Sequence, residues 1–151
     1  MGYRIGSIRA TTTRAGSGGA SLLLYVVDDD DATLALLRDV AEEAGWEAHG
    51  FARLAPLRVA LRARRPAMLI LDDELPDGRG GDLARELRSD PDMAGVPMLV
   101  CTAAHPMRRA EIGSWAPVVS KPFDLGEIER FLDAAGSDAH GAPSPFRQAA
   151  G

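Results

Sequence analysis

Short apolar runs alternate with longer stretches of helical spacing between residues 21 and 135 of this chain. In the longer stretches apolar residues recur every three or four positions, which is typical of amphipathic helices, whereas the short runs have the length of strands. The predicted strands cover 22–27, 46–51, 68–71, 97–102 and 117–120. A predicted helix follows each strand, and the fourth of these helices, at 106–112, is short. Five such strand–helix units predict a doubly wound α/β fold, with a parallel sheet, helices on both of its faces and right-handed crossovers.

Two end segments fall outside this pattern. Residues 1–20 carry glycine, serine, threonine and three arginines but no acids, and their few apolar side chains cannot bury enough surface to offset the entropy of ordering the chain. Residues 136–151 are rich in glycine, serine, alanine and proline. We therefore expect a disordered N-terminal extension over 1–20, one domain over 21–135 and a flexible C-terminal tail over 136–151.

The composition is that of an ordinary globular domain, with 46% hydrophobic and 26% charged residues in a chain of 151. The net charge of −5 argues against nucleic acid as a partner. Cys101 is the single cysteine, so an internal disulfide is excluded, and its place inside a predicted strand makes it an inert core residue. No apolar run approaches membrane-spanning length. We expect a cytoplasmic protein with no nucleic-acid or membrane partner.

Two of the predicted strands run directly into acidic residues. The first strand is followed by four aspartates at 28–31, and the third by Asp72, Asp73 and Glu74. Because neighbouring parallel strands end at the same edge of a sheet, these acids can share one crevice. Crowded carboxylates raise each other's pKa, and a hard cation with oxygen ligands, above all Mg²⁺, neutralises them. The pattern therefore predicts a magnesium site, and one or two of the four aspartates are expected to cap the following helix, with Asp30 and Asp31 preferred for that role.

Two further strand ends add a hydroxyl and an ammonium group to this edge. The fourth predicted strand ends in Thr102, and Lys121 follows the fifth. A carboxylate beside a metal ion can act as a nucleophile toward phosphorus. A hydroxyl can then donate a hydrogen bond to a phosphoryl oxygen, and an ammonium group can neutralise its charge. Together these strand ends supply the groups that phosphoryl transfer to an aspartate requires.

Four segments, in this order along the chain, resemble the motifs of the receiver domain of two-component response regulators. They are VVDD at 26–29, LDDELPDGRG at 71–80, VCTA at 100–103 and SKPF at 120–123. The resemblance covers residues 21–135 and implies a flavodoxin-like sheet with the strand order 2-1-3-4-5. It also implies that Gly80 is the turn glycine before the third helix and that the peptide bond between Lys121 and Pro122 is cis.

The same resemblance assigns roles to the residues at the carboxyl edge. Asp72 is then the phosphoacceptor and contributes an oxygen to the bound Mg²⁺. Asp29 is a direct ligand of the ion, Asp28 is a ligand through water, and the backbone carbonyl of Glu74 completes the protein's share of the metal site. Besides these metal ligands, the residues with a part in the chemistry are Thr102, the switch hydroxyl, and Lys121, the phosphate-binding lysine.

A protein of this kind is a single-domain response regulator rather than an enzyme with other substrates, since it catalyses only its own phosphorylation and dephosphorylation. The resemblance implies that a histidine kinase or a histidine phosphotransfer protein supplies the phosphoryl group. It also implies a downstream effector protein that binds the face formed by the fourth helix, the fifth strand and the fifth helix, and it allows a homodimer. We expect the output to lie in another protein.

Three alternative interpretations accompany this one. Asp73 can replace Asp72 as the acceptor, although the Asp-x-x-Leu-Pro spacing selects Asp72. The chain can also be a pseudo-receiver that binds partners without phosphorylation, because Val118 occupies the position of the usual switch aromatic and the fourth helix is short. An aspartyl-phosphate hydrolase of the haloacid dehalogenase type would require Asp-x-Asp followed by Thr or Val, whereas this chain has Glu74 and Pro76 at the third and fifth positions.

Overall fold

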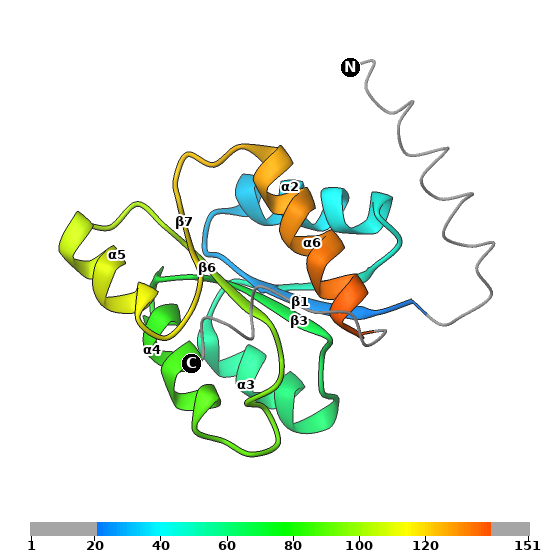
Figure 1. The fold of residues 1–151 in the computed structure, drawn as a ribbon, viewed down its shortest axis with the longest axis horizontal. Helices are drawn as coiled ribbons and strands as arrows, with labels where there is room; N and C mark the ends of the chain where they lie inside the picture. Colours follow the sequence, from blue (N-terminus) through cyan, green and yellow to red (C-terminus); the bar gives the residue numbers. More distant parts are fainter. Residues whose placement is uncertain (1–20, 140–151) are drawn as a thin grey trace.

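A five-stranded parallel sheet forms the centre of the computed structural model, which describes residues 21–139 (Figure 1). Its strands are β1 (Leu23–Val27), β2 (Glu47–Phe51), β3 (Met68–Asp72), β6 (Met98–Thr102) and β7 (Val118–Ser120). They lie in the order β2-β1-β3-β6-β7, and every neighbouring pair is parallel. When only these strands are numbered along the chain, the order is 2-1-3-4-5, which confirms the predicted doubly wound, flavodoxin-like fold.

Helices cover both faces of this sheet, as Figure 1 shows. On one face lie α2 (Asp31–Glu43) and α6 (Leu125–Ala139). On the other lie α3 (Leu54–Ala63), α4 (Gly80–Arg88) and α5 (Pro106–Gly113). The last of these is short, as the sequence predicts. The carboxyl ends of the strands therefore lie at one edge of the sheet, between the two layers of helices.

Strand β3 separates two apolar cores. Leu71 packs with side chains of α3, α4 and α5, whereas Ile70 packs with those of α2 and α6. Successive side chains of a strand point to opposite faces of its sheet. The alternation continues past the end of the strand, so the side chains of Asp72 and Asp73 point to opposite sides of the sheet. Asp72 meets Lys121, which follows β7, whereas Asp73 contacts α4 and α5.

Local signals set the ends of α2. Asp30 is its N-cap and accepts a hydrogen bond from the backbone N–H of Thr33 at 2.9 Å, while Asp31 stands in the first turn, near the positive end of the helix dipole. Beyond the C-cap, Gly45 has a φ of 94°, a conformation that glycine adopts without strain. The expectation that Asp30 and Asp31 cap the helix is confirmed, which leaves the first two aspartates of the run for the site.

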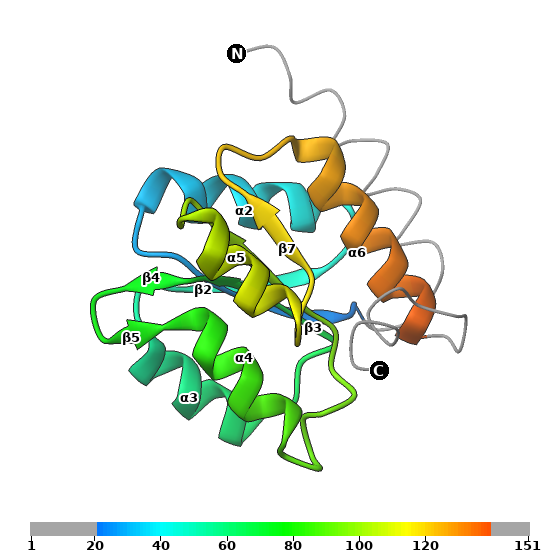
Figure 2. The same cartoon turned by 60° about the vertical axis from the view of Figure 1, so that its left-hand side comes forward.

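The structure differs from the sequence prediction in two places. A hairpin of β4 (Glu74–Leu75) and β5 (Gly78–Arg79) follows β3, and strands of two residues carry no periodicity that could have predicted it (Figure 2). In addition, α6 continues to Ala139, past residue 135, where the sequence places the start of a tail. Ala135 and Asp138 are both buried, so packing extends the helix through residues that read as loop-forming in the sequence.

Cys101 is buried in β6, and burial raises the pKa of its thiol to about 12, so it is an inert core residue as expected. Within 21–139, no helix combines the length and the apolar character that spanning a bilayer requires. The predicted extension over 1–20 and the remainder of the predicted tail, 140–151, lie outside the described residues.

Candidate functional site

Three aspartates converge at the carboxyl edge of the sheet. Asp28 and Asp29 follow β1, and Asp72 ends β3, the strand that pairs with β1 in a register of Val27 to Leu71. One carboxylate oxygen of each aspartate lies within 4.8 Å of the others. Asp28 and Asp72 are buried while Asp29 is exposed, so the group opens to solvent on one side. Oxygen donors at this spacing fit a divalent cation such as Mg²⁺.

The surroundings of Asp72 favour its protonated form. Burial, followed by the negative charge of Asp28, raises the pKa of Asp72 to about 6, and Lys121 offsets part of that rise. The backbone N–H of Glu74 donates a hydrogen bond to Asp72 Oδ1 at 3.4 Å. A bound cation would remove the repulsion between the carboxylates, because it is itself the largest local charge. The donor set therefore fits Mg²⁺ chemically as well as in its spacing.

Metal-free protein should lose stability through Asp72 as the pH rises from about 4 to about 6. Its pKa is raised from 3.8 to about 6 on folding, so the stabilisation is complete below the unfolded pKa and lost as the pH passes the folded one. Two pKa units correspond to at most about 3 kcal/mol. In urea unfolding without divalent cations, Asp72→Asn should be the more stable form near about pH 7.5, and its advantage should shrink by more than about half near about pH 4.5. An advantage that is independent of pH would contradict this.

Lys121 supplies the positive charge of the site. Its Nζ lies 2.7 Å from Asp28 Oδ2 and 3.4 Å from Asp72 Oδ1. Burial lowers the pKa of Lys121, but its contacts with the two aspartates outweigh that effect and raise it above its ordinary value. Lys121 is the only lysine in the sequence. The site therefore has the compact charge of an ammonium group, whereas all other Lys/Arg positions in the sequence carry the planar guanidinium of arginine. The peptide bond from Lys121 to Pro122 is cis, as the resemblance implies.

Thr102 ends β6 beside Lys121. It is the register partner of Ser120 in β7, and its carbonyl accepts a hydrogen bond from the Lys121 N–H at 2.9 Å. The side chain is buried, and its Oγ1 accepts a hydrogen bond from the Ala104 N–H at 3.0 Å. The hydroxyl proton takes no part in that bond, so it can be donated to an oxygen in the crevice.

Gly80 lets the chain return against the end of β3. Its N–H donates a hydrogen bond to the Asp73 carbonyl at 3.1 Å, and a Cβ at this position would lie 2.0 Å from the carbonyl oxygen of Asp72. No side chain fits at that distance, so the connection from β3 to α4 can close in this way only with glycine. The hairpin that carries Glu74 is thereby held against the backbone of Asp72.

Asp73, the alternative acceptor, is bound on the other side of the sheet. It is completely buried and accepts hydrogen bonds from the Gly81 N–H at 3.0 Å and from Arg108 Nη2 at 2.8 Å. Burial raises the pKa of Asp73, but these hydrogen bonds outweigh it and hold the pKa below its ordinary value. Asp73 is therefore a packed ion-pair partner with no place in the crevice, which favours Asp72 as the acceptor.

Arg108 in α5, the partner of Asp73, carries no signal in the sequence that identifies it. The two residues are 35 positions apart and share no motif. The signal that could have pointed to such a partner is the acid at position 73, where the alternation of β3 favours an apolar residue facing α3 and α4. A buried acid implies a buried cation, although the pattern does not say which arginine supplies it.

The strand order and the acids at its carboxyl edge define a doubly wound α/β protein with an acidic crevice at the switch point of the sheet. Residues 24–133 match the family model of the response regulator receiver domain. The chain therefore belongs to this family, which is a signalling module and not an enzyme in the usual sense.

Solved structures of receiver domains are similar to this chain. The receiver domain of a signal transduction histidine kinase from Syntrophus aciditrophicus has a TM-score of 0.73 at 22% identity, over 82% of this chain and 96% of that one. A chemotaxis response regulator of Vibrio cholerae has a TM-score of 0.68 at 19% identity, over 76% and 98%. The receiver domain of a DNA binding response regulator from Colwellia psychrerythraea has a TM-score of 0.72 at 16% identity, over 78% and 99%. No curated protein matches the sequence.

Proposed function

We propose that this protein is a phosphorylation-dependent switch in which Asp72 accepts a phosphoryl group from a histidine kinase or a histidine phosphotransfer protein. The observation that carries the proposal is the position of Asp72. An oxygen of this buried carboxylate lies 3.4 Å from the Lys121 ammonium, and one lies within 4.8 Å of the oxygens of two further aspartates. Nucleophile, cation site and a positive charge for the transferred group are thus combined at one point.

Asp29, Asp72 and the backbone carbonyl of Glu74 are the direct Mg²⁺ ligands in this proposal, and Asp28 acts through water. Both oxygens of Asp28 are already engaged, Oδ1 by a backbone N–H at 2.9 Å and Oδ2 by Lys121 at 2.7 Å, which favours a role through water. Asp29 is exposed, so its carboxylate is free to turn toward an ion. When bound, Mg²⁺ supplies positive charge to the oxygens of the transferring group.

The protein's part in the transfer is a nucleophile with suitable surroundings. An oxygen of Asp72 attacks the phosphorus of the partner's phosphohistidine in line with the P–N bond, which breaks and returns the histidine to the partner. Lys121 then turns from Asp28 toward a phosphoryl oxygen, and Thr102 donates its hydroxyl proton to another. Because Thr102 Oγ1 holds the Ala104 N–H, this change also moves the segment that follows β6.

The output surface in this proposal is the face formed by α5, β7 and α6. The charge gained beside Thr102 and Lys121 biases this face between two arrangements. Coupling energies of ~1–3 kcal/mol would change the affinity for an effector protein by a factor between about five and about a hundred. A downstream effector is the partner that we assign to this face, and a homodimer is a further form in which such a switch can act.

Neither of the other protein classes has a specific observation in its favour. A pseudo-receiver has no need of a complete acidic crevice with its lysine, yet all four of these side chains meet at one edge of the sheet. A hydrolase of the haloacid dehalogenase type needs an aspartate two residues after the nucleophile. This chain has Glu74 there, at the start of the short hairpin, with an exposed side chain.

The single lysine allows a direct test of the proposal. Beryllofluoride mimics a phosphoryl group and should bind beside Asp72 only when Mg²⁺ is present. Because the bound mimic engages Lys121 Nζ, acylation of that amine, followed by peptide mass spectrometry, should slow by about tenfold or more, the worth of one charge-assisted hydrogen bond. The α-amino group of the chain serves as the reference amine in the same digest. Equal acylation of Lys121 with and without Mg²⁺ and the mimic would refute the proposal.

A further inference from the structure

Asp73 is the buried centre of an ion-pair network that joins three elements. Arg108 of α5 donates to its carboxylate from Nε at 3.0 Å and from Nη2 at 2.8 Å. The Gly81 N–H in the first turn of α4 donates to the same carboxylate at 3.0 Å, and Nη1 of Arg79 in β5 lies 3.4 Å away. Because Asp73 directly follows Asp72, only one peptide bond and one ion pair separate the proposed phosphoacceptor from α5.

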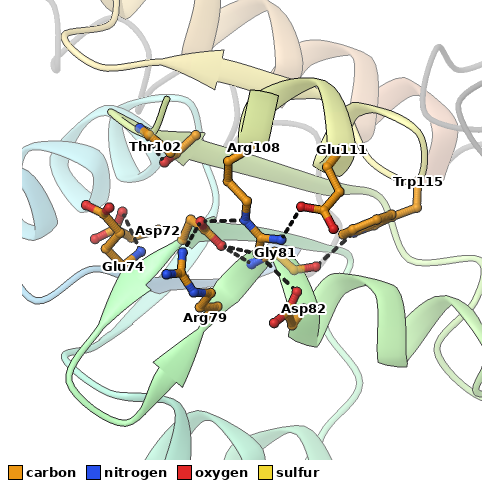
Figure 3. A network of polar contacts seen from close by, with 11 residues as sticks. Asp72, Glu74, Arg79, Gly81, Asp82, Thr102, Arg108, Glu111 and Trp115 are labelled. Carbon is orange, nitrogen blue, oxygen red and sulfur yellow. Dashed lines mark hydrogen bonds and ion pairs between the residues drawn. The ribbon is translucent and has the colours of Figure 1, made fainter. Parts of the chain in front are cut away.

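Arg108 also binds the first turn of α4 and a residue of its own helix. Nη2 donates to Asp82 Oδ1 at 3.0 Å and Nη1 to Glu111 Oε1 at 3.1 Å, and only 15% of the Arg108 side chain is exposed. A second link runs beside it, from Trp115 Nε1 to the Gly81 carbonyl at 2.8 Å. Figure 3 shows both side chains reaching from α5 and the loop after it toward the start of α4.

An ion pair is not required to fill this space stably. Loss of Arg108 alone would leave the buried Asp73 with only the Gly81 N–H and the exposed Arg79 as partners, and breaking a buried pair in this way costs about 3–5 kcal/mol. Replacement of both residues by apolar side chains of similar volume is, in contrast, often neutral or stabilising. Packing alone therefore does not account for a charged connection at this point, directly after Asp72.

A switch aromatic in β7, the usual link from the crevice to the output face, is absent from this protein. Residue 118 in β7 is a valine, half-buried and paired with Val100 in the sheet. A β-branched side chain is stiff at χ1 and cannot swing between two positions as a large ring can. Besides the segment after β6 that Thr102 moves, the side of β3 opposite the crevice offers a second path to α5, through Asp73.

Building on the proposed function, we propose that Arg108 is a positioning residue that couples the phosphoacceptor loop to helix α5. Through Asp73 it holds the backbone that carries Asp72 and the Glu74 carbonyl. The same contact passes a displacement of that backbone to α5, because the arginine is anchored in the helix. The coupling therefore works in both directions, as linkage requires.

Phosphorylation changes the balance of charge around Arg108. The guanidinium is shared between the end of β3 and two acids, Asp82 and Glu111. Added negative charge on Asp72 strengthens the attraction of the Arg108 guanidinium to the end of β3, relative to its attraction to Asp82 and Glu111. α5 moves with the arginine, and so does the exposed surface of this helix, where the Met107 side chain is 76% exposed.

The test removes both charges of the pair at once. In Asp73→Leu/Arg108→Met, apolar side chains fill the space and no buried charge is left unpaired. The matched control, Arg58→Met/Glu86→Leu, removes a two-bond ion pair of 2.8 and 3.1 Å that links α3 to α4. Both double variants are compared with the wild type in Mg²⁺ with and without beryllofluoride.

The two tryptophans report on the two sides of the sheet. The Trp115 indole N–H is bonded to α4, whereas Trp46 is buried against α2 and α6. In ¹H–¹⁵N spectra of the wild type and of the control, the mimic should shift the Trp115 indole signal. In Asp73→Leu/Arg108→Met the mimic should still protect Lys121 from acylation, with an affinity within about tenfold of the wild type, while the Trp115 shift should fall at least about threefold.

A Trp115 shift of full size in Asp73→Leu/Arg108→Met would overturn the inference, and so would a wild type that binds the mimic with no Trp115 shift. A wild type that does not bind the mimic refutes the proposed function, and the inference falls with it. If the double variant does not fold, the Arg108 Nε–H signal of the wild type decides. That signal must shift when the mimic binds, and an unchanged signal overturns the inference.

Discussion

Asp72→Asn should abolish phosphorylation of the protein by a small phosphodonor such as acetyl phosphate. The carboxamide lacks the nucleophilic oxygen of the carboxylate, and the neighbouring acids cannot replace it. Asp73 is buried and bound by Arg108, and both oxygens of Asp28 are engaged. Intact-protein mass spectrometry should find one added phosphoryl group on the wild type in Mg²⁺, none after chelation with EDTA, and none on the variant.

Asp73→Asn is the matched control, because it makes the same replacement in the adjacent acid. The change weakens the contact with Arg108 but leaves the Asp72 carboxylate in the crevice. A folded Asp73→Asn protein should therefore still gain the phosphoryl group, at a reduced rate. Labelling that persists in Asp72→Asn and disappears in folded Asp73→Asn would reverse the assignment of the acceptor.

Gly80→Ala should damage stability and phosphorylation together. A Cβ at residue 80 would lie 2.0 Å from the Asp72 carbonyl oxygen and 3.2 Å from the Leu71 Cβ, and both neighbours belong to a buried strand that cannot give way. The loop must therefore open, at a cost of about 3 kcal/mol or more, which is in the range of severe core strain. Urea unfolding measures the stability, and labelling by acetyl phosphate should fall even under conditions where the variant is folded.

Gly113→Ala provides the comparison for this variant. Gly113 ends α5 in open space, with nothing within 4 Å of an added Cβ, so alanine there should be neutral or stabilise the protein by up to about 1 kcal/mol. Its labelling should equal that of the wild type. Equal stability of the Gly80→Ala and Gly113→Ala proteins would mean that the loop does not depend on close contact with Asp72.

The fold could be predicted because its determinants are local. Each strand of the sheet is a short apolar run, and each helix has its own apolar periodicity, so the elements and their type follow from neighbouring positions alone. The parallel topology then places all strand ends at one edge. For this reason the strand pattern alone groups Asp28, Asp72, Thr102 and Lys121, although they are far apart in the sequence.

What the sequence does not predict depends on contacts between distant segments. Residues 136–138 have the composition of a loop, yet they continue α6, and Asp138 is buried there. Asp73 reads as a second candidate acceptor, because it directly follows Asp72 at the end of the same apolar run. Its separate role follows from the alternation of β3 and from an arginine 35 positions later, neither of which has a motif. The candidate site was therefore predictable, and its connection to α5 was not.

The buried pair of Asp73 and Arg108 also restricts how this sequence can diverge. A change of either residue alone passes through a protein whose buried ion pair is broken, at about 3–5 kcal/mol, which is a large share of the 5–15 kcal/mol that holds a typical domain together. The acid and the arginine are then inherited together or replaced together. Among descendants of a common ancestor, positions 73 and 108 should covary, with lineages divided between a charged and an apolar pair and with few mixed combinations.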